Sequence, residues 1–176
     1  KFDGKGIEII DKIEKDLKYN KLYGLDHKHV IESINNFYII HSDDYICTLH
    51  EFIRYIGRPT EDQLKAIAMQ IIRKLNLFHK NGLLYLNLTP KTVVVDLKGK
   101  FHLSKFYYVQ HYLEKQTCLH REEHIDILPP EIFHSDVLDQ TADLYSLGIL
   151  LFELLLGFKP LKTEDVFEYE TLLKNN

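Results

Sequence analysis

The sequence predicts an α+β domain in which helices dominate and the strands are short and antiparallel. Two segments predict the helices: a capped amphipathic stretch from Thr60 to about His79, and a leucine-rich stretch from Asp139 to Leu156. Two short apolar runs joined by the turn Asp96–Gly99 predict a strand pair. A chain of 176 residues is long enough for one domain with a sizeable core.

Composition excludes several classes of protein. The net charge is -4 with the two signs mixed along the chain, which gives no electrostatic case for a nucleic-acid partner. No apolar run approaches the roughly 18 residues of a membrane span, and residues 1–4 do not resemble a signal peptide. Cys47 and Cys118 are isolated, which favours a reducing compartment, so we expect a cytoplasmic protein.

The first third of the chain predicts one helix and two strands. Apolar residues recur at helical spacing in Ile7–Leu25. The segment Val30–Ile40 contains two stretches of residues that favour β-strands, separated by Asn-Asn. This pattern predicts two antiparallel strands. Tyr45–Cys47 is a further short apolar piece.

Two helices follow. Leu49–Tyr55 predicts a short helix that ends at the Gly57–Pro59 turn. Thr60 and Gln63 match a capping box at the start of the next helix, which ends at Asn81-Gly82. The expected buried face of this second helix consists of Leu64, Ile67, Ala68, Ile71, Ile72, Leu75 and Phe78.

The centre of the chain reads as a turn and a hairpin. A polar turn, Leu86–Thr92, leads into a β-branched run, Val93–Val95. The Asp-Leu-Lys-Gly turn then leads into a second run, Phe101–Leu103.

The last third contains the most apolar helix. A polar region without a clean period, Gln110–Asp126, precedes a short helical turn at Glu131–Phe133. The helix Asp139–Leu156 is so rich in leucine that we expect it to be buried on most sides. Thr163 is expected to cap a final amphipathic helix that ends near Leu173.

Several of these segments together resemble protein kinases. Tyr85–Tyr107 resembles the catalytic and metal-binding hairpin, [HY]-R-D-L-K-P-x-N, two strands and D-F-G. Pro129-Pro130-Glu131 resembles A-P-E, and Asp143–Gly148 resembles the motif that opens the buried helix of the large lobe. Tyr85 and the stretch IGRPTEDQLKAIAMQI look like the cyclic-nucleotide-dependent branch of the AGC kinases.

The resemblance implies a kinase-like fold with a reduced small lobe. It assigns residues 1–47, an αC-like helix and two strands, to the small lobe and residues 48–176 to the large lobe. No G-x-G-x-x-G loop precedes the first predicted helix, and the motifs end before the last helices of the large lobe. The segment Tyr45–Leu49 is also short for the hinge that holds adenine in the family.

The resemblance also shows where the chemistry departs from the family pattern. Asn87 replaces the Asp base, and Thr89 replaces the Lys that neutralises phosphate charge. Thr92 replaces the Asn that binds one Mg²⁺, and Lys105 replaces the D-F-G Asp that is the main metal ligand. We therefore expect no catalytic residues, no metal site and no ATP or Mg²⁺ cofactor.

Other family positions retain residues that support the fold. Tyr85 and Phe106 match two members of the hydrophobic column that joins the lobes, but we interpret both, like Val94, as ordinary core residues. Val94 lies where the family packs under adenine, and it is a pocket position together with Lys105. Asp143 matches the buried Asp that anchors the catalytic loop through backbone N–H groups.

A few residues are candidates for structural or partner contacts. Glu131 matches the Glu that pairs with an Arg from the last helices of the family. Glu153 falls where cyclic-nucleotide-dependent kinases bind a basic substrate residue, or it is simply paired within the domain. Phe167 lies on the apolar stripe of the last predicted helix, which is either a protein-binding patch or a face that further helices would cover.

The segment His120–His124 matches H-x-x-E-H, an inverted zinc-protease pattern. It falls in the slot of the activation segment, where no helix and no third ligand is predicted, so we interpret it as a solvated polar loop. His120 also stands about where active relatives carry a phosphorylatable Thr.

The sequence thus predicts a catalytically inactive pseudokinase that acts by binding another protein, such as an active kinase or a signalling complex. One alternative is an atypical serine/threonine kinase or nucleotide-binding protein that uses a degenerate site without metal. Another alternative is a purely structural domain of a larger assembly.

Overall fold

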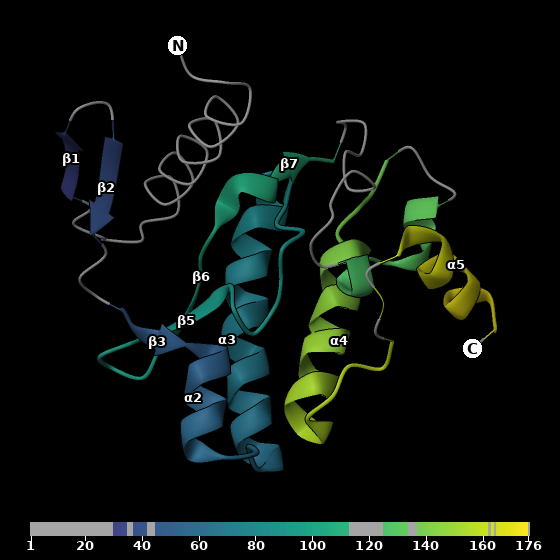
Figure 1. The fold of residues 1–176 in the computed structure, drawn as a ribbon, viewed down its shortest axis with the longest axis horizontal. Coiled ribbons are helices and arrows are strands. Elements are labelled where there is room, and N and C mark those ends of the chain that lie inside the picture. Colours follow the sequence, from purple (N-terminus) through teal and green to yellow (C-terminus); the bar gives the residue numbers. More distant parts are fainter. Residues whose placement is uncertain are drawn as a thin grey trace.

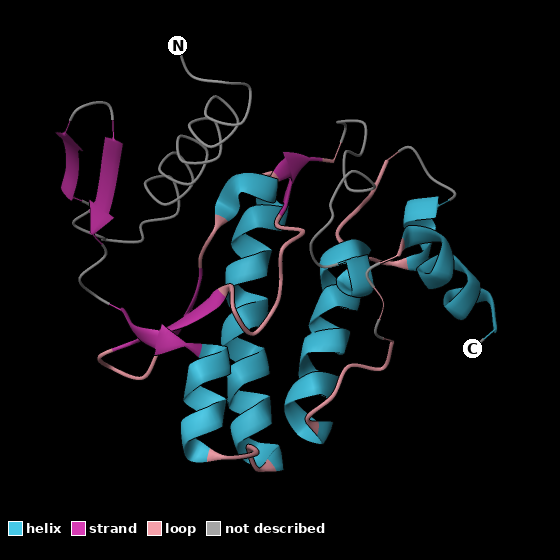
Figure 2. Ribbon diagram, viewed as in Figure 1, coloured by secondary structure: helices cyan, strands magenta, loops and turns pink. Residues whose placement is uncertain are grey.

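A computed structural model of the chain describes residues 30–34, 37–41, 45–112, 125–133, 137–161, 163 and 165–175. Figure 1 shows α3 (Glu61–Lys80) and α4 (Thr141–Leu156) side by side at the centre of this part of the chain. Figure 2 shows that helices dominate, with short strands to one side, so the predicted α+β class is confirmed. The predicted helix Ile7–Leu25 lies outside the described residues.

Capping boxes start the first two helices of the described chain, α2 and α3. Thr48 accepts the backbone N–H of Glu51 at the start of α2 (Leu49–Ile56), and Glu51 accepts the N–H of Thr48 in return. Thr60 and Gln63 make the same reciprocal pair at the start of α3, as the sequence predicts.

The strands of the described residues form three small antiparallel sheets. β1 (Val30–Ile34) pairs with β2 (Phe37–His41), as the Asn-Asn break predicts. A second sheet has the order β3-β5-β6, and a third pairs β4 with β7. The bounds of these strands are Tyr45–Thr48 for β3, Leu83–Leu84 for β4, Val93–Asp96 for β5, Phe101–Leu103 for β6 and Gln110–His111 for β7.

The core lies between the helices and the central hairpin. On the expected face of α3, Ile67, Ile71, Leu75 and Phe78 are buried, whereas Ile72 is 39% exposed. These side chains pack with Val93, Val95, Phe101 and Leu103 from the hairpin and with Leu147, Leu150 and Leu154 from α4. This packing fixes the hairpin against both helices. It thereby sets the position of the loop that precedes the hairpin in the chain.

One expectation about the last third is confirmed and one needs correction. The helix α4 is buried on most sides, and a narrow stripe that includes Leu144, 49% exposed, and Leu155, 47% exposed, faces outward. Thr163 does not cap α5 (Val166–Asn175), because Asp165 accepts the backbone N–H of Glu168 instead. The Thr163 hydroxyl accepts the Asp165 N–H and donates to the Glu168 carboxylate, so it braces the cap from outside the helix.

Short 3-10 turns complete the described fold: η1 (Phe106–Tyr108), η3 (Ile125–Ile127) and η4 (Pro130–Phe133). The predicted helical turn at Glu131–Phe133 falls within η4. None of the helices in the described ranges is long and apolar enough to cross a membrane.

Candidate functional site

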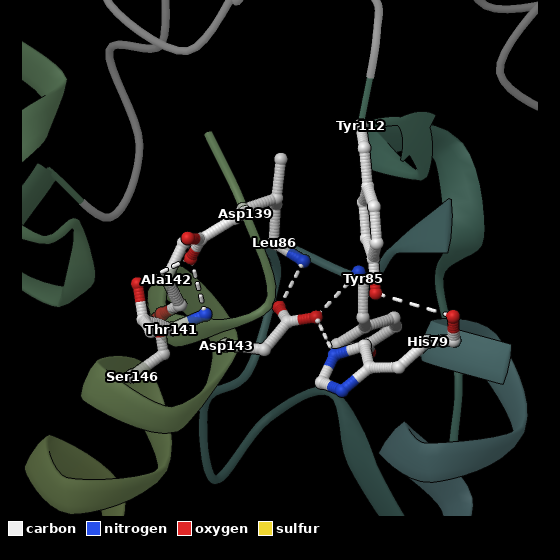
Figure 3. Close-up of polar contacts among 9 residues, drawn as sticks. All are labelled: His79, Tyr85, Leu86, Tyr112, Asp139, Thr141, Ala142, Asp143 and Ser146. Atoms are coloured by element: carbon white, nitrogen blue, oxygen red, sulfur yellow. Dashed lines mark hydrogen bonds and ion pairs between the residues drawn. The ribbon is translucent and has the colours of Figure 1, made fainter. Parts of the chain in front are cut away.

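The loop between β4 and β5 is fastened to the first turn of α4 by Asp143. This carboxylate is fully buried. Its Oδ2 accepts the backbone N–H of Tyr85 at 2.8 Å, and its Oδ1 accepts the N–H of Leu86 at 2.7 Å (Figure 3). The hydrogen bonds to the loop that the sequence predicts for Asp143 are therefore present in the structure.

His79 supplies a third contact to the same carboxylate. Its Nε2 lies 2.9 Å from Oδ2 of Asp143, and the hydroxyl of Tyr112 donates to the His79 carbonyl (Figure 3). The end of α3, the loop and the start of α4 thus meet at one buried charge. Such a charge is tolerated in the interior only because donors surround it.

Leu86 adopts a backbone conformation that is rare for leucine. Its φ is 56°, in the left-handed region, where a Cβ atom costs energy. Its side chain is buried in an apolar cluster that includes Leu128, Ile132 and Ala142. The apolar packing and the bond to Asp143 together offset the backbone strain at this residue.

Three aromatic rings pack beside the loop. Phe106 stacks on Phe78 with centroids 5.7 Å apart, and Tyr85 meets both rings edge-on at 5.8 and 5.9 Å. Tyr85 and Phe106 are fully buried, and the Tyr85 hydroxyl donates to the Ser104 carbonyl. Both residues lie in one aromatic cluster of the described fold, which is also what ordinary core packing gives.

Asn87 is the residue that the sequence resemblance predicts at the position of the catalytic base. Its Nδ2 donates to the carbonyl of Lys105 at 2.9 Å, and because a carbonyl only accepts, this contact fixes the orientation of the amide. Its Oδ1 is buried and has no hydrogen-bond partner among the described residues. An amide has no basic site near pH 7, so this side chain binds the hairpin without being able to take a proton.

The hydroxyls of the two threonines in the loop form hydrogen bonds within the loop itself. The Thr92 hydroxyl donates to the Asn87 carbonyl and accepts the N–H of Thr89 at 2.9 Å. The Thr89 hydroxyl accepts the N–H of Lys91 at 3.2 Å. Thr89 and Thr92 are 2% and 1% exposed, so both hydroxyls stabilise the turn from within it.

Lys105 is the last of the four positions at which the sequence resemblance predicts a departure from the family pattern. It has φ 56° and an exposed side chain immediately before η1. An ammonium group at this point repels a divalent cation. Within the described ranges, no three His, Cys, Asp or Glu side chains gather where they would hold a metal ion.

Glu153 lies near groups of both charge signs that the domain itself supplies. Burial raises the pKa of Glu153 and the Asp126 carboxylate adds to this rise, while Lys159, His50 and Lys91 act in the opposite direction. Its Oε2 has no hydrogen-bond partner in the described part of the chain. Lys159 donates to buried Asp126 at 2.7 Å, so this lysine is already held by a second carboxylate.

The other candidate residues occupy less central positions. Val94 is 8% exposed in the middle of β5. Glu131 is half-buried, and its Oε1 accepts the Thr141 hydroxyl at 3.3 Å. Asp139 also receives the hydroxyl and the N–H of Thr141, and these hydrogen bonds lower the pKa of Asp139. The side chain of Phe167 lies outside the described residues, although its backbone belongs to α5.

Sequence reasoning missed the contacts between residues that are far apart in the chain. His79 and Asp126 were not singled out, although His79 contacts the Asp143 carboxylate and Asp126 pairs with Lys159. The positive φ of Leu86 also had no signal, because leucine gives no hint of a left-handed turn. An acidic residue within an otherwise apolar helical stretch, as for Asp143, is the sequence pattern that does predict such a contact.

The described helices, hairpin and anchored loop define a kinase-like domain. Comparison with known families agrees: the protein kinase domain family matches residues 11–175. The chain therefore belongs to the protein kinase family.

Individual relatives carry kinase names. Serine/threonine-protein kinase 36 of Mus musculus is 25% identical over 156 residues, which are 85% of this chain and 12% of that protein. The cAMP-dependent protein kinase catalytic subunit of Schizosaccharomyces pombe is 30% identical over 127 residues, 72% of this chain and 25% of that protein. Catalytic subunit 3 of Drosophila melanogaster is 27% identical over 142 residues, 79% of this chain and 24% of that protein.

These relatives confirm the predicted resemblance to cyclic-nucleotide-dependent kinases. The chain spans a quarter or less of the length of the curated relatives named above. Their family is therefore shared with this chain, and the activity of a whole protein is a separate question.

Proposed function

We propose that this chain is a catalytically inactive kinase domain that acts by binding another protein, as a scaffold or an allosteric regulator in signalling. The observation that carries the proposal is the pair Asn87 and Lys105. The Asn87 side-chain amide donates to the backbone carbonyl of Lys105 at 2.9 Å, so the two residues lie next to each other. An amide and an ammonium stand where phosphoryl transfer needs a base and a metal ligand. The proposal includes an intracellular setting and no use of ATP or Mg²⁺.

The hydrogen bonds that the Thr89 and Thr92 hydroxyls make within the loop support the same conclusion. Their buried hydroxyls are hydrogen-bonded to the loop backbone, so the loop keeps its shape without a ligand. The Asp143 anchor and the aromatic cluster are retained, which favours selection for the fold over selection for catalysis. A retained fold with altered chemistry is what a binding module requires.

The kinase names of the relatives favour a second candidate, an atypical kinase that works with a degenerate site. A phosphotransfer assay with ATP, Mg²⁺ or Mn²⁺, and generic serine/threonine peptides separates the two. We expect no rate above the blank and no change in Asn87→Ala. A rate that disappears in Lys105→Ala establishes the second candidate and contradicts inactivity.

The binding role needs its own measurement. The tagged chain is used to capture a kinase, and the activity of that kinase is then measured with and without added chain. We expect a concentration-dependent change in its activity. A complex that forms without any change in activity contradicts allosteric regulation and leaves scaffolding as the role.

A further inference from the structure

We propose that Lys74, Lys98 and Lys100 form a docking surface for an acidic segment of a partner protein, one that carries an apolar side chain between its carboxylates. This basic surface lies where α3 meets the turn between β5 and β6, at the opposite end of β5 from the loop that contains Asn87. The proposal rests on the proposed function, because it names the chemistry of the protein that such a binding module takes.

Packing of β6 against α3 brings two of the lysines together. Figure 1 shows β6 beside α3, and Gln70 of α3 accepts the backbone N–H of Phe101 at the start of β6 at 3.1 Å. Lys74 follows Gln70 by one helical turn, so both side chains leave the same face of α3. Lys100 directly precedes Phe101, and its charge acts on Lys74. Two cations from distant parts of the chain therefore lie near each other.

The positive charge of Lys74 is not neutralised within the domain. Its side chain is half-buried, and in the described part of the chain none of the three ammonium groups forms an ion pair or a hydrogen bond. Burial lowers the pKa of Lys74, Lys100 lowers it further, and Asp96 acts in the opposite direction. A carboxylate from a partner would offset both the partial loss of water and the repulsion by Lys100.

Asp96, the acidic residue next to this turn, is already engaged. Its Oδ1 accepts the N–H groups of Lys98 and Lys100 at 2.8 and 2.9 Å, and its Oδ2 lies 2.9 Å from Nε2 of His102. These bonds fix the backbone that carries the two lysines before any partner arrives, which reduces the entropy lost on binding. The neutralising acid must therefore come from another molecule.

Leu97 adds an apolar element to the basic surface. Its side chain is 78% exposed at the turn, directly before Lys98. A segment that places an apolar residue among carboxylates matches this combination. A long polyanion such as nucleic acid, or an anionic membrane, would also meet the acidic residues of a chain whose net charge is -4. The charge distribution therefore favours a short acidic segment of a protein.

Binding of a probe peptide tests the surface. The probe has glutamates on both sides of a single leucine and carries a neutral dye, and fluorescence polarisation gives its Kd. We expect saturable binding that weakens as salt is added. Lys74→Met removes the ammonium group but keeps an aliphatic stem, and we expect it to raise Kd about five-fold or more. The double variant Lys98→Ala and Lys100→Ala, at exposed side chains, should have a similar effect.

The matched control is Lys65→Met on the same helix. The Lys65 ammonium pairs with Glu61 at 2.7 Å, so its loss should change Kd by less than about two-fold. A peptide with glutamines in place of the glutamates should not bind. Leu97→Ser should weaken binding of the probe and leave a probe with glycine in place of its leucine unaffected.

Two results would overturn the proposal. One is the same Kd for the wild type, the double variant and a natively folded Lys74→Met. The other is lysine-dependent binding to phosphatidylserine vesicles or duplex DNA without binding of the probe peptide, which would show that the ligand is not an acidic protein segment.

The peptide titration and the kinase capture described above fail separately. Lysine-dependent peptide binding by a chain that regulates no kinase supports the basic surface and contradicts the proposed regulatory role. Regulation of a captured kinase that Lys74→Met and the double variant leave unchanged contradicts the basic surface and supports the proposed function.

Discussion

Asp143 holds Leu86 in a left-handed backbone conformation, with the Leu86 N–H donating to Oδ1 of Asp143 at 2.7 Å where φ is 56°. The same carboxylate binds the N–H of Tyr85 through its second oxygen. A charge in the first turn of one helix therefore fixes the path of a loop that begins 58 residues earlier in the chain. None of Asn87, Thr89, Thr92 and Lys105 takes part in these two hydrogen bonds.

Removing the Asp143 carboxylate is expected to destabilise the domain strongly. Asp143→Ala leaves two buried N–H groups and His79 without their acceptor, which costs about 3–5 kcal/mol. Asp143→Asn keeps one acceptor oxygen and should cost less. Urea unfolding measures both, and Asp62→Ala at a 99% exposed side chain is the control, with an effect within about 0.5 kcal/mol. Equal stabilities for Asp143→Ala and the control contradict the anchor.

The strain at Leu86 gives a second prediction. Both Leu86→Ala and Leu86→Gly remove the same buried side chain, so both should be destabilising. In most positions glycine is the worse of the two by about 0.5–1 kcal/mol. At φ 56° the order should reverse, with Leu86→Gly more stable than Leu86→Ala by about 1 kcal/mol. The usual order in urea unfolding would show that the left-handed conformation is not kept in solution.

The sequence predicted the helices and the hairpin because their signals are local. The Thr60 and Gln63 capping box, for example, lies within four consecutive residues, and the structure contains both of its hydrogen bonds. The exposed stripe of α4 was not predicted, because Leu144 and Leu155 are leucines just as several buried residues of the helix are. Which side of an apolar helix is covered depends on its packing partners, and periodicity does not name them.

The candidate site was predictable in outline and not in its contacts. The motif positions located Asn87, Lys105 and Asp143 in the sequence. The hydrogen bond from Asn87 to the Lys105 carbonyl and the inward turn of the Thr92 hydroxyl depend on side-chain directions, which spacing alone does not fix.

Tyr169 gives a prediction about buried hydroxyls. Its side chain is fully buried, and its hydroxyl donates to the Leu128 carbonyl at 2.8 Å. Tyr169→Phe should cost about 1–2 kcal/mol, because the carbonyl loses its donor. Tyr55→Phe, at a 92% exposed side chain, is the matched control and should have no effect. If both variants unfold at the wild-type urea concentration, the hydrogen bond contributes nothing.

The same residue should make stability depend on alkaline pH. Burial raises the pKa of Tyr169 above its usual range. The unfolded chain loses this proton near pH 10 while the folded chain keeps it, so the stabilising contribution is complete below about pH 10 and falls above it. The stability difference between the wild type and Tyr169→Phe should therefore shrink in urea melts above about pH 10. A constant difference contradicts a hydroxyl that stays protonated in the fold.

Glu153 gives a pH dependence of the same sign, but at acid pH. Burial raises the pKa of Glu153, so the folded state favours the protonated form of this carboxyl. Its stabilising contribution is complete below the ordinary pKa of glutamate, about 4.3, and is lost as the pH rises through the higher folded value. Glu153→Gln mimics the protonated form. It should be more stable than the wild type at pH 7 and equal to it near pH 3.5 in thermal melts.

The control for this prediction is Glu61→Gln, at a carboxylate that is 80% exposed, where the difference should stay within about 0.5 kcal/mol at both values of pH. A Glu153→Gln variant that is less stable than the wild type at pH 7 would show that Lys159, Lys91 and His50 outweigh burial. In that case the domain gains from a charged Glu153, and the carboxylate is an internal partner of these cations. A stabilised variant means instead that the chain keeps Glu153 against its own stability, which favours a contact with a basic group of a partner protein.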